Sequence, residues 1–212
     1  MTSKFFAALR FLAAFGLLGS VVWQVTDRLA HNLFRPGEYF AYFSIQSTLI
    51  AAVMMAVNGW ALWRGVQETR TLTLMRLCAV TFEVIVALVY NALLRGLPPA
   101  AVDAGYNWPV LPNEVMHVWG PVLILVDWVL ASWAIRVRYR AVFWVLAFPL
   151  VWVAFTIVRG SITGWWPYWF LDPTGAGGVG SMLMYIFGIM FLLVFGASFV
   201  LGLQRLAVRL RR

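Results

Sequence analysis

The chain of 212 residues is 63% hydrophobic and only 11% charged, which leaves too little polar surface to coat a water-soluble globule of this size. Its formal net charge of +8 comes from basic residues scattered between long apolar runs, and this pattern argues against a nucleic-acid-binding face. The 12 Trp, 16 Phe and 7 Tyr residues fit a membrane protein instead, because aromatic rings collect at the depth of the lipid headgroups.

Six apolar runs approach the roughly 20 residues that one helical span needs. None alternates with the period of two expected of a membrane strand, and a helix satisfies its own backbone hydrogen bonds in lipid. We therefore predict an all-α integral membrane protein, in which one domain forms a bundle of six transmembrane helices. The expected spans are approximately 9–27, 39–63, 72–94, 112–135, 139–158 and 179–203.

The basic residues divide unevenly between the two sides of this bundle. Four of the 16 fall on one side, at Arg28, Arg35, Arg95 and Arg159, and twelve fall on the side that holds both termini. By the positive-inside rule, this predicts that both termini are cytoplasmic. The twelve are Lys4, Arg10, Arg64, Arg70, Arg76, Arg136, Arg138, Arg140, Arg205, Arg209, Arg211 and Arg212.

The second expected span carries a group of polar residues near its outer end. Ser44 lies roughly 8 Å below that end at 1.5 Å per residue, and Ser47 and Thr48 share its helix face. Gln46 extends the polar stretch. Such hydroxyls often bond back to their own helix or join two helices, so the structural interpretation stays open beside a functional one.

The third and fourth spans bring polar side chains to a similar depth. Asn91 lies roughly 6 Å and His117 roughly 8 Å below the outer end, and His117 is the only histidine inside a span. A serine hydroxyl within reach of a neutral imidazole is the minimum apparatus for nucleophilic acyl transfer. We expect Ser44, Asn91 and His117 to line one cavity in the outer leaflet.

Two carboxylates lie deeper, Glu83 in the third span and Asp127 in the fourth. A charged carboxylate is costly there, so each is expected to be protonated, hydrogen-bonded or paired with an arginine such as Arg10 or Arg76. A proton relay through Glu83, Asp127 and His117 is the alternative, and it would fit a small-molecule or proton-linked transporter. No cofactor or metal site is expected, because two histidines without a cysteine cluster make a poor zinc site.

The last outer loop, 159–173, is rich in aromatic residues and turn formers. It is either an interfacial aromatic belt or a lid, and Arg159 is available to bind a carboxylate or phosphate head group.

Four stretches together resemble the bacterial branch of the androgen-induced protein family, which also includes the androgen-dependent TFPI-regulating protein. The resemblance covers most of the chain. The stretches are Tyr42-Phe-Ser-Ile-Gln-Ser-Thr48, Tyr90-Asn-Ala-Leu-Leu-Arg95, Asn113-Glu-Val-Met-His-Val-Trp-Gly-Pro121 with Asp127-Trp128, and Arg159-Gly through Trp165-Trp-Pro-Tyr-Trp-Phe-Leu-Asp-Pro173.

This resemblance implies a six-span hydrolase in the bacterial plasma membrane. Animal members cleave fatty acid esters of hydroxy fatty acids with a threonine on the second span and a histidine on a later one. Ser44 stands at the threonine position here and His117 at the histidine position, while a shifted alignment would nominate Thr48 instead. A different substrate, or no hydrolase activity, remains open for bacterial members.

We therefore expect His117 to act as general base while Ser44 attacks the ester carbonyl of a membrane lipid. The rival interpretations are the transporter and a non-catalytic membrane scaffold. The expected supporting residues near the site are Gln46, Ser47, Thr48, Asn91, Arg95, Asn113, Glu114, Arg159 and Asp172. Among these, Asn91, Gln46 or Arg159 would donate to the oxyanion, and Asn113 or Glu114 would orient the imidazole.

Overall fold

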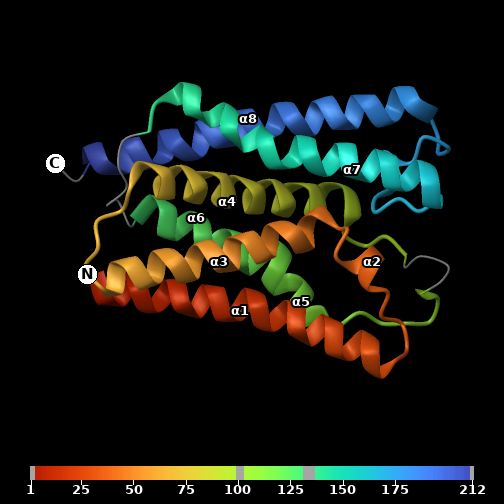
Figure 1. Ribbon diagram of the computed structural model, residues 1–212, viewed down its shortest axis with the longest axis horizontal. Helices are drawn as coiled ribbons and strands as arrows, with labels where there is room; N and C mark the ends of the chain where they lie inside the picture. The colour runs from red at the N-terminus through yellow and green to blue at the C-terminus, as the bar shows by residue number, and fades with distance from the viewer. Residues whose placement is uncertain (1–2, 99–102, 131–136, 211–212) are drawn as a thin grey trace.

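The protein, seen here as a computed structural model, is a bundle of long helices that run roughly side by side (Figure 1). The structure describes residues 3–98, 103–130 and 137–210, and no strand occurs among them. The predicted all-α fold is confirmed for this part of the chain. The α-helices are α1 (Ser3–Ala30), α2 (Pro36–Tyr39), α3 (Phe43–Trp63), α4 (Arg70–Val89), α5 (Val110–Glu114), α6 (Gly120–Leu130), α7 (Ala147–Thr163) and α8 (Gly178–Leu210).

Shorter helical segments extend or join these helices. Two of them are π-helical, η1 (Tyr90–Leu94) at the end of α4 and η3 (Val115–Trp119) between α5 and α6. Two more are 3-10 helices, η4 (Tyr139–Leu146), which leads into α7, and η5 (Trp169–Leu171) in the loop before α8.

Five continuous helical stretches in the described residues are long and apolar enough to cross a membrane, and they indicate an integral membrane protein. They correspond to all the predicted spans except the fourth. In its place, α5, η3 and α6 follow one another as three short segments, and residues 131–135 of that predicted span lie outside the described ones. The five stretches are Ser3–Ala30, Phe43–Trp63, Arg70–Leu94, Tyr139–Thr163 and Gly178–Leu210.

The surface of the bundle carries large apolar side chains. Phe15 is 70% exposed, Ile162 79% and Phe187 69%, on three different helices. Lipid tails are as apolar as these side chains, so a surface that would be unfavourable in water is suited to a bilayer.

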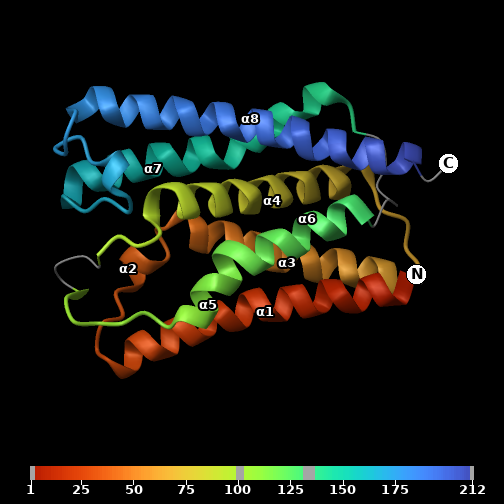
Figure 2. The same cartoon turned by 180° about the vertical axis from the view of Figure 1, so that it is seen from behind.

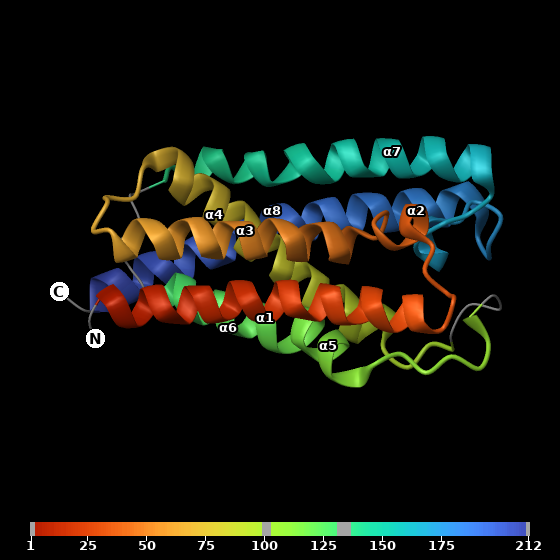
Figure 3. The ribbon, with the colours of Figure 1, turned by 60° about the horizontal axis from the view of Figure 1, so that its bottom comes forward.

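The helices alternate in direction. The start of α1 and the end of α8 lie at the same end of the bundle, together with the connection between α3 and α4 (Figure 1). We call this the terminal end and the opposite one the distal end. Seen from behind, α5 and α6 follow one another at an angle, and α5 lies close to α1 (Figure 2). Figure 3 shows α7 and α1 at opposite sides, with α3, α4 and α8 between them.

Small residues allow α1 and α3 to pack closely. A Cβ at Gly59 would lie 3.3 Å from the carbonyl oxygen of Ala7 and 3.3 Å from Cβ of Arg10, so glycine there lets the two backbones approach. Ala7 on α1 and Ala51 and Ala52 on α3 are also buried. Close contact through small residues is the usual way in which helices associate in lipid.

A buried ion cluster ties four helices together near the terminal end. Nε of Arg10 donates to both carboxylate oxygens of Asp127, at 3.0 and 3.1 Å, and Nη1 of Arg76 donates to the same carboxylate at 3.4 Å. Nη1 of Arg10 also donates to the carbonyl oxygen of Asn58 at 3.3 Å. Of the alternatives expected for Asp127, pairing with an arginine is the one the structure shows, and both Arg10 and Arg76 take part. This pairing offsets part of the cost of a charge in the interior.

Candidate active site

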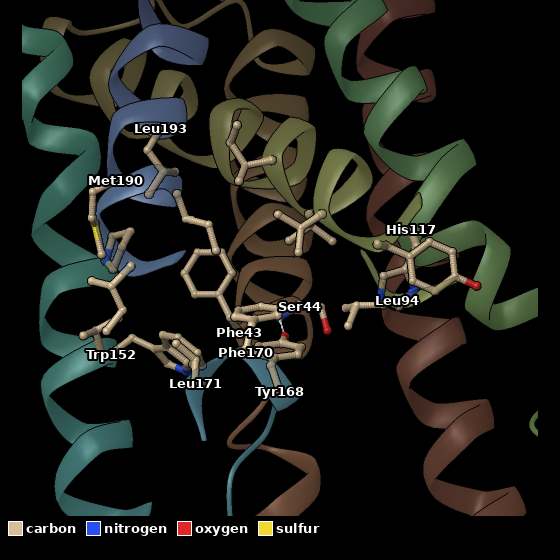
Figure 4. Close-up of a pocket in the computed structure, with 18 residues that line it drawn as sticks. Phe43, Ser44, Leu94, His117, Trp152, Tyr168, Phe170, Leu171, Met190 and Leu193 are labelled. Atoms are coloured by element: carbon tan, nitrogen blue, oxygen red, sulfur yellow. Dashed lines mark hydrogen bonds between the residues drawn. The ribbon is translucent and has the colours of Figure 1, made fainter. Parts of the chain in front are cut away.

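An apolar cavity opens between α3, α4, α7 and α8 at the level of the loop that carries η5 (Figure 4). Among its lining residues lies about 610 Å³ of space that no protein atom fills, including space open to the surroundings. Its walls are almost entirely hydrophobic, and Ser44, Tyr90, His117 and Tyr168 bring polar groups to them. The apolar lining residues are Phe43, Ile85, Val86, Val89, Leu94, Pro149, Trp152, Val153, Phe170, Leu171, Ile186, Ile189, Met190 and Leu193.

Ser44 reaches the cavity from the first turn of α3. The first backbone N–H groups of a helix have no partner within it, and the N–H of Ser44 donates to the hydroxyl of Tyr168 at 3.2 Å. One turn further, the hydroxyl of Ser47 donates to the carbonyl oxygen of Ser44 at 3.0 Å. The nucleophile candidate therefore lies on a helix terminus that is held from both sides.

Tyr168 lies against the start of α3. Burial raises the pKa of Tyr168 to about 12, so its hydroxyl keeps its proton at neutral pH. The hydroxyl oxygen accepts from the N–H of Ser44, and the hydroxyl proton can in addition be donated to a nearby acceptor. This places a neutral hydrogen-bond donor beside the side chain of Ser44 (Figure 4).

His117 reaches the cavity from the π-helical segment η3. Pro121 has no N–H to offer the carbonyl of His117 four residues earlier, and its ring would crowd that carbonyl in a regular α-helix. The wider π turn absorbs this conflict, and such turns frequently occur at functional sites. The sequence predicted a span here but not this distortion.

The hydrogen bond of His117 defines which ring nitrogen is available. Nδ1 lies 2.9 Å from the carbonyl oxygen of Asn113, which can only accept, so we assign the proton to Nδ1. Nε2 is then the unprotonated nitrogen of a neutral imidazole. A general base requires this tautomer.

Tyr90 holds the imidazole from the other side. The two rings are 4.4 Å apart between centroids with an interplanar angle of 30°, and Nδ2 of Asn113 donates to the hydroxyl of Tyr90 at 2.7 Å. Asn113 thus fixes His117 through its main chain and Tyr90 through its side chain. Glu114 does not contact the imidazole by a hydrogen bond described here, since its carboxylate accepts from Arg95 at 2.6 and 2.7 Å.

Ser44 and His117, both in the described part of the chain, line the same cavity without a hydrogen bond between them. In the view of Figure 4, Leu94 lies between the two side chains. Catalytic hydrogen bonds are often long or poorly aligned in ligand-free sites and tighten when substrate binds.

Arg159 lies on α7, because that helix continues to Thr163 and does not end at 158 as predicted. Its guanidinium carbon is 4.4 Å from the centroid of the Trp165 ring, and its Nη1 is buried with no hydrogen-bond partner among the described residues. Trp165 packs edge-on against Tyr42, which packs in the same way against Tyr168. A row of aromatic rings thus leads from Arg159 to the cavity.

Other predicted site residues lie away from the cavity lining. Asn91 is exposed and donates to the carbonyl oxygen of Ala87 on its own helix, so the structure does not bring it to Ser44 and His117. Gln46 donates to the carbonyl oxygen of Phe40 at 2.7 Å. Asp172 accepts from the backbone and side chain of Thr174, at 2.8 and 2.7 Å, and stabilises the loop.

Two further predicted residues are buried in the helix interfaces. Thr48 is fully buried and its hydroxyl has no hydrogen-bond partner among the described residues, but it does not line the cavity. Glu83 is also fully buried, and the described residues supply no ion-pair partner for its carboxyl group. Of the two hydroxyls proposed as nucleophile, only that of Ser44 faces the cavity.

Tyr90 and Tyr168 were not among the predicted site residues. Both belong to the stretches that carry the family resemblance, and this was the one available signal. Tyr168 lies in a loop, and neither helical periodicity nor depth in a span predicts where a loop side chain points.

Comparison of the chain with protein-family models, with curated proteins and with solved structures finds no match.

Proposed function

We propose that this protein is a membrane-embedded hydrolase of lipid esters, with Ser44 as nucleophile and His117 as general base. One observation carries the proposal. A serine at a helix N-terminus and a histidine with an unprotonated Nε2 line one apolar cavity inside a bundle of membrane-spanning helices. The hydrocarbon groups of a lipid ester suit these apolar walls, and such an ester would reach the cavity without leaving the bilayer.

In the proposed reaction the hydroxyl oxygen of Ser44 attacks the ester carbonyl, and Nε2 of His117 takes the hydroxyl proton. The tetrahedral intermediate collapses with loss of the alcohol, which receives that proton from the imidazolium. Water then attacks the acyl-serine with His117 again as base, and the products are a fatty acid and an alcohol. Asn113 and Tyr90 serve as positioning residues that keep the imidazole in the required tautomer and orientation.

Tyr168 and the start of α3 are suited to stabilise the oxyanion. The hydroxyl of Tyr168 is a neutral donor beside Ser44, and the positive end of the α3 dipole points to the same place. We therefore assign the oxyanion role to Tyr168 and not to Asn91 or Gln46, whose amide groups donate to backbone carbonyl oxygens.

We further propose six spans, of which α5, η3 and α6 form the fourth, with both termini in the cytoplasm of a bacterium. The terminal end of the bundle would then face the cytoplasm and the cavity would open in the outer leaflet. The uneven distribution of basic residues supports this orientation. Membership of the androgen-induced protein family fits the presence of Ser44 and His117 in the lining of one cavity.

The transporter alternative is less well supported. A proton-linked transporter needs a chain of titrating groups. Asp127 already accepts hydrogen bonds from two buried arginines, and among the described residues no hydrogen bond links it to Glu83. The interpretation as a non-catalytic scaffold does not account for the polar groups that line an otherwise apolar cavity.

Hydrolysis of a p-nitrophenyl octanoate substrate by the purified protein in detergent tests the proposal. We expect Ser44→Ala and His117→Ala to lower kcat by at least about 1,000-fold, because the nucleophile and its base act as one unit. Thr48→Ala should keep activity, since Thr48 does not face the cavity.

Ser198→Ala is the matched control for the loss of a hydroxyl. Ser198 lies on α8, bonds back to the carbonyl oxygen of Val194 and does not line the cavity. Activity that survives Ser44→Ala, or that is lost in Thr48→Ala while the protein stays folded, would overturn the assignment of the nucleophile.

A further inference from the structure

We infer that the depth of the cavity limits the length of the substrate's acyl chain. Ile85 and Leu193 form the floor that sets this limit. The inference rests on the proposed hydrolase function and adds a substrate class, esters of medium-chain acids of about eight carbons.

The lining residues give the depth of the cavity. On α8 they run from Ile186 to Leu193, seven residues or about 10 Å along the helix. On α4 and η1, the distance from Tyr90 down to Ile85 is about 7 Å. An extended chain advances about 1.2 Å per bond, so these two depths accommodate roughly six to eight carbons below the carbonyl.

The floor is formed where α8 and α4 come into direct contact. A Cβ at Gly196 would lie 3.3 Å from Cδ1 of Ile85 and 3.8 Å from Cγ2 of Thr81. The backbone of α8 is therefore pressed against the Ile85 side chain one turn below Leu193. Ile85 and Leu193 are themselves 2% and 1% exposed, so the space ends at two tightly packed side chains.

The other end of the cavity is closed by the loop that carries η5. Tyr168, Phe170 and Leu171 line it there, and Tyr168 is bonded to the backbone of Ser44. From Ser44 the space runs inward, toward Met190 and Leu193 (Figure 4), and we place the acyl chain of the ester there. The acyl group, rather than the alcohol, is the part of the substrate that meets the floor.

A series of p-nitrophenyl esters with acyl chains from four to sixteen carbons tests this inference. Each added methylene contributes about 0.8 kcal/mol when buried, so kcat/KM should rise about fourfold per carbon up to about eight carbons and then stop rising or fall. Leu193→Ala should move the maximum to longer chains. Ile85→Phe should move it to shorter ones by filling the floor.

Leu192→Ala is the matched control, because the same change is made one residue away on a side chain that does not line the cavity. It should leave the chain-length profile in place. The thermal unfolding of every variant shows whether it is folded, and Ile85→Phe tests the floor without creating a cavity.

The outcomes separate the two proposals. If the wild-type protein hydrolyses none of the esters, the proposed function is wrong and the inference falls with it. If it hydrolyses them with no dependence on chain length, or if neither Leu193→Ala nor Ile85→Phe shifts the maximum, the hydrolase stands and the inference is overturned.

Discussion

At the scale of single residues, the environment of Ser44 differs from that of the other hydroxyls on its helix. Its backbone N–H is bound by Tyr168, its carbonyl is bound by Ser47, and its side chain faces the cavity. Ser47 and Thr48 are fully buried. Depth in the span identified Ser44, Ser47 and Thr48 as a group, but only the packing of α3 against its neighbours separates them.

Tyr168→Phe tests the oxyanion role at this scale. Removing one donor to a developing oxyanion typically costs 100-fold to 1,000-fold in kcat, so we expect a fall of about 100-fold in ester hydrolysis with little change in KM. Tyr185→Phe is the control, because Tyr185 packs against Trp169 and Phe170 but does not line the cavity. Unchanged kcat in Tyr168→Phe would remove Tyr168 from the mechanism.

The sequence marked His117 as functional, but the structure shows which contacts set its tautomer and its orientation. The cost of burying a titratable group marked His117 as functional. Its tautomer depends on the carbonyl of Asn113, and its orientation depends on stacking with Tyr90. These contacts join segments 23 residues apart through Asn113 and Tyr90, so the sequence alone could not predict them.

At the scale of elements, the length of the apolar runs predicted the five long apolar helices. The predicted fourth span is not one regular α-helix, because it contains a π-helical segment. The predicted second span, 39–63, begins instead with a break between α2 and α3, which gives Ser44 its place in a first turn. The predicted fourth span is distorted at η3, where Gly120 and Pro121 stand together. A hydropathy window averages over such positions and does not detect them.

Gly120 is required for the distorted segment to pack. A Cβ there would lie 2.6 Å from Cδ2 of Leu17 and 2.7 Å from the carbonyl oxygen of Val115, and the carbonyl is backbone that cannot easily move. We expect Gly120→Ala to destabilise the protein by about 1–3 kcal/mol, the usual cost of overpacking, and to lower activity by displacing His117.

Thermal unfolding in detergent measures this effect. Gly188→Ala is the control, because no atom lies within 4 Å of the added methyl group and alanine favours the helix. A Gly120→Ala variant as stable as the wild-type protein would show that η3 does not depend on this contact.

At the scale of the whole molecule, the bundle has two regions of different character. Near the terminal end, the cluster of Arg10, Arg76 and Asp127 holds α1, α4 and α6 together. Toward the distal end, the space between α3, α4, α7 and α8 is left open as a cavity with few polar groups. The ion cluster and the candidate site thus lie toward opposite ends of the same bundle.

Composition alone predicted the class of this molecule, because a chain so apolar has no stable arrangement in water. The ion cluster was predicted in part, since a buried carboxylate needs a partner and Arg10 and Arg76 were named as candidates. The cavity was not predicted, because its walls come from four helices whose relative rotation is set by packing and not by periodicity.

The most direct test of the central claim is the site at which a lipophilic alkyl phosphonate reacts with the protein in liposomes. The reagent is a fluorophosphonate, which loses fluoride when an activated hydroxyl attacks its phosphorus, and the phosphonyl adduct stays on the nucleophile. Mass spectrometry should find one phosphonate per chain, on Ser44. It should be absent in Ser44→Ala and form much more slowly in His117→Ala. An adduct on Thr48, or labelling that Ser44→Ala leaves unchanged, would contradict the account.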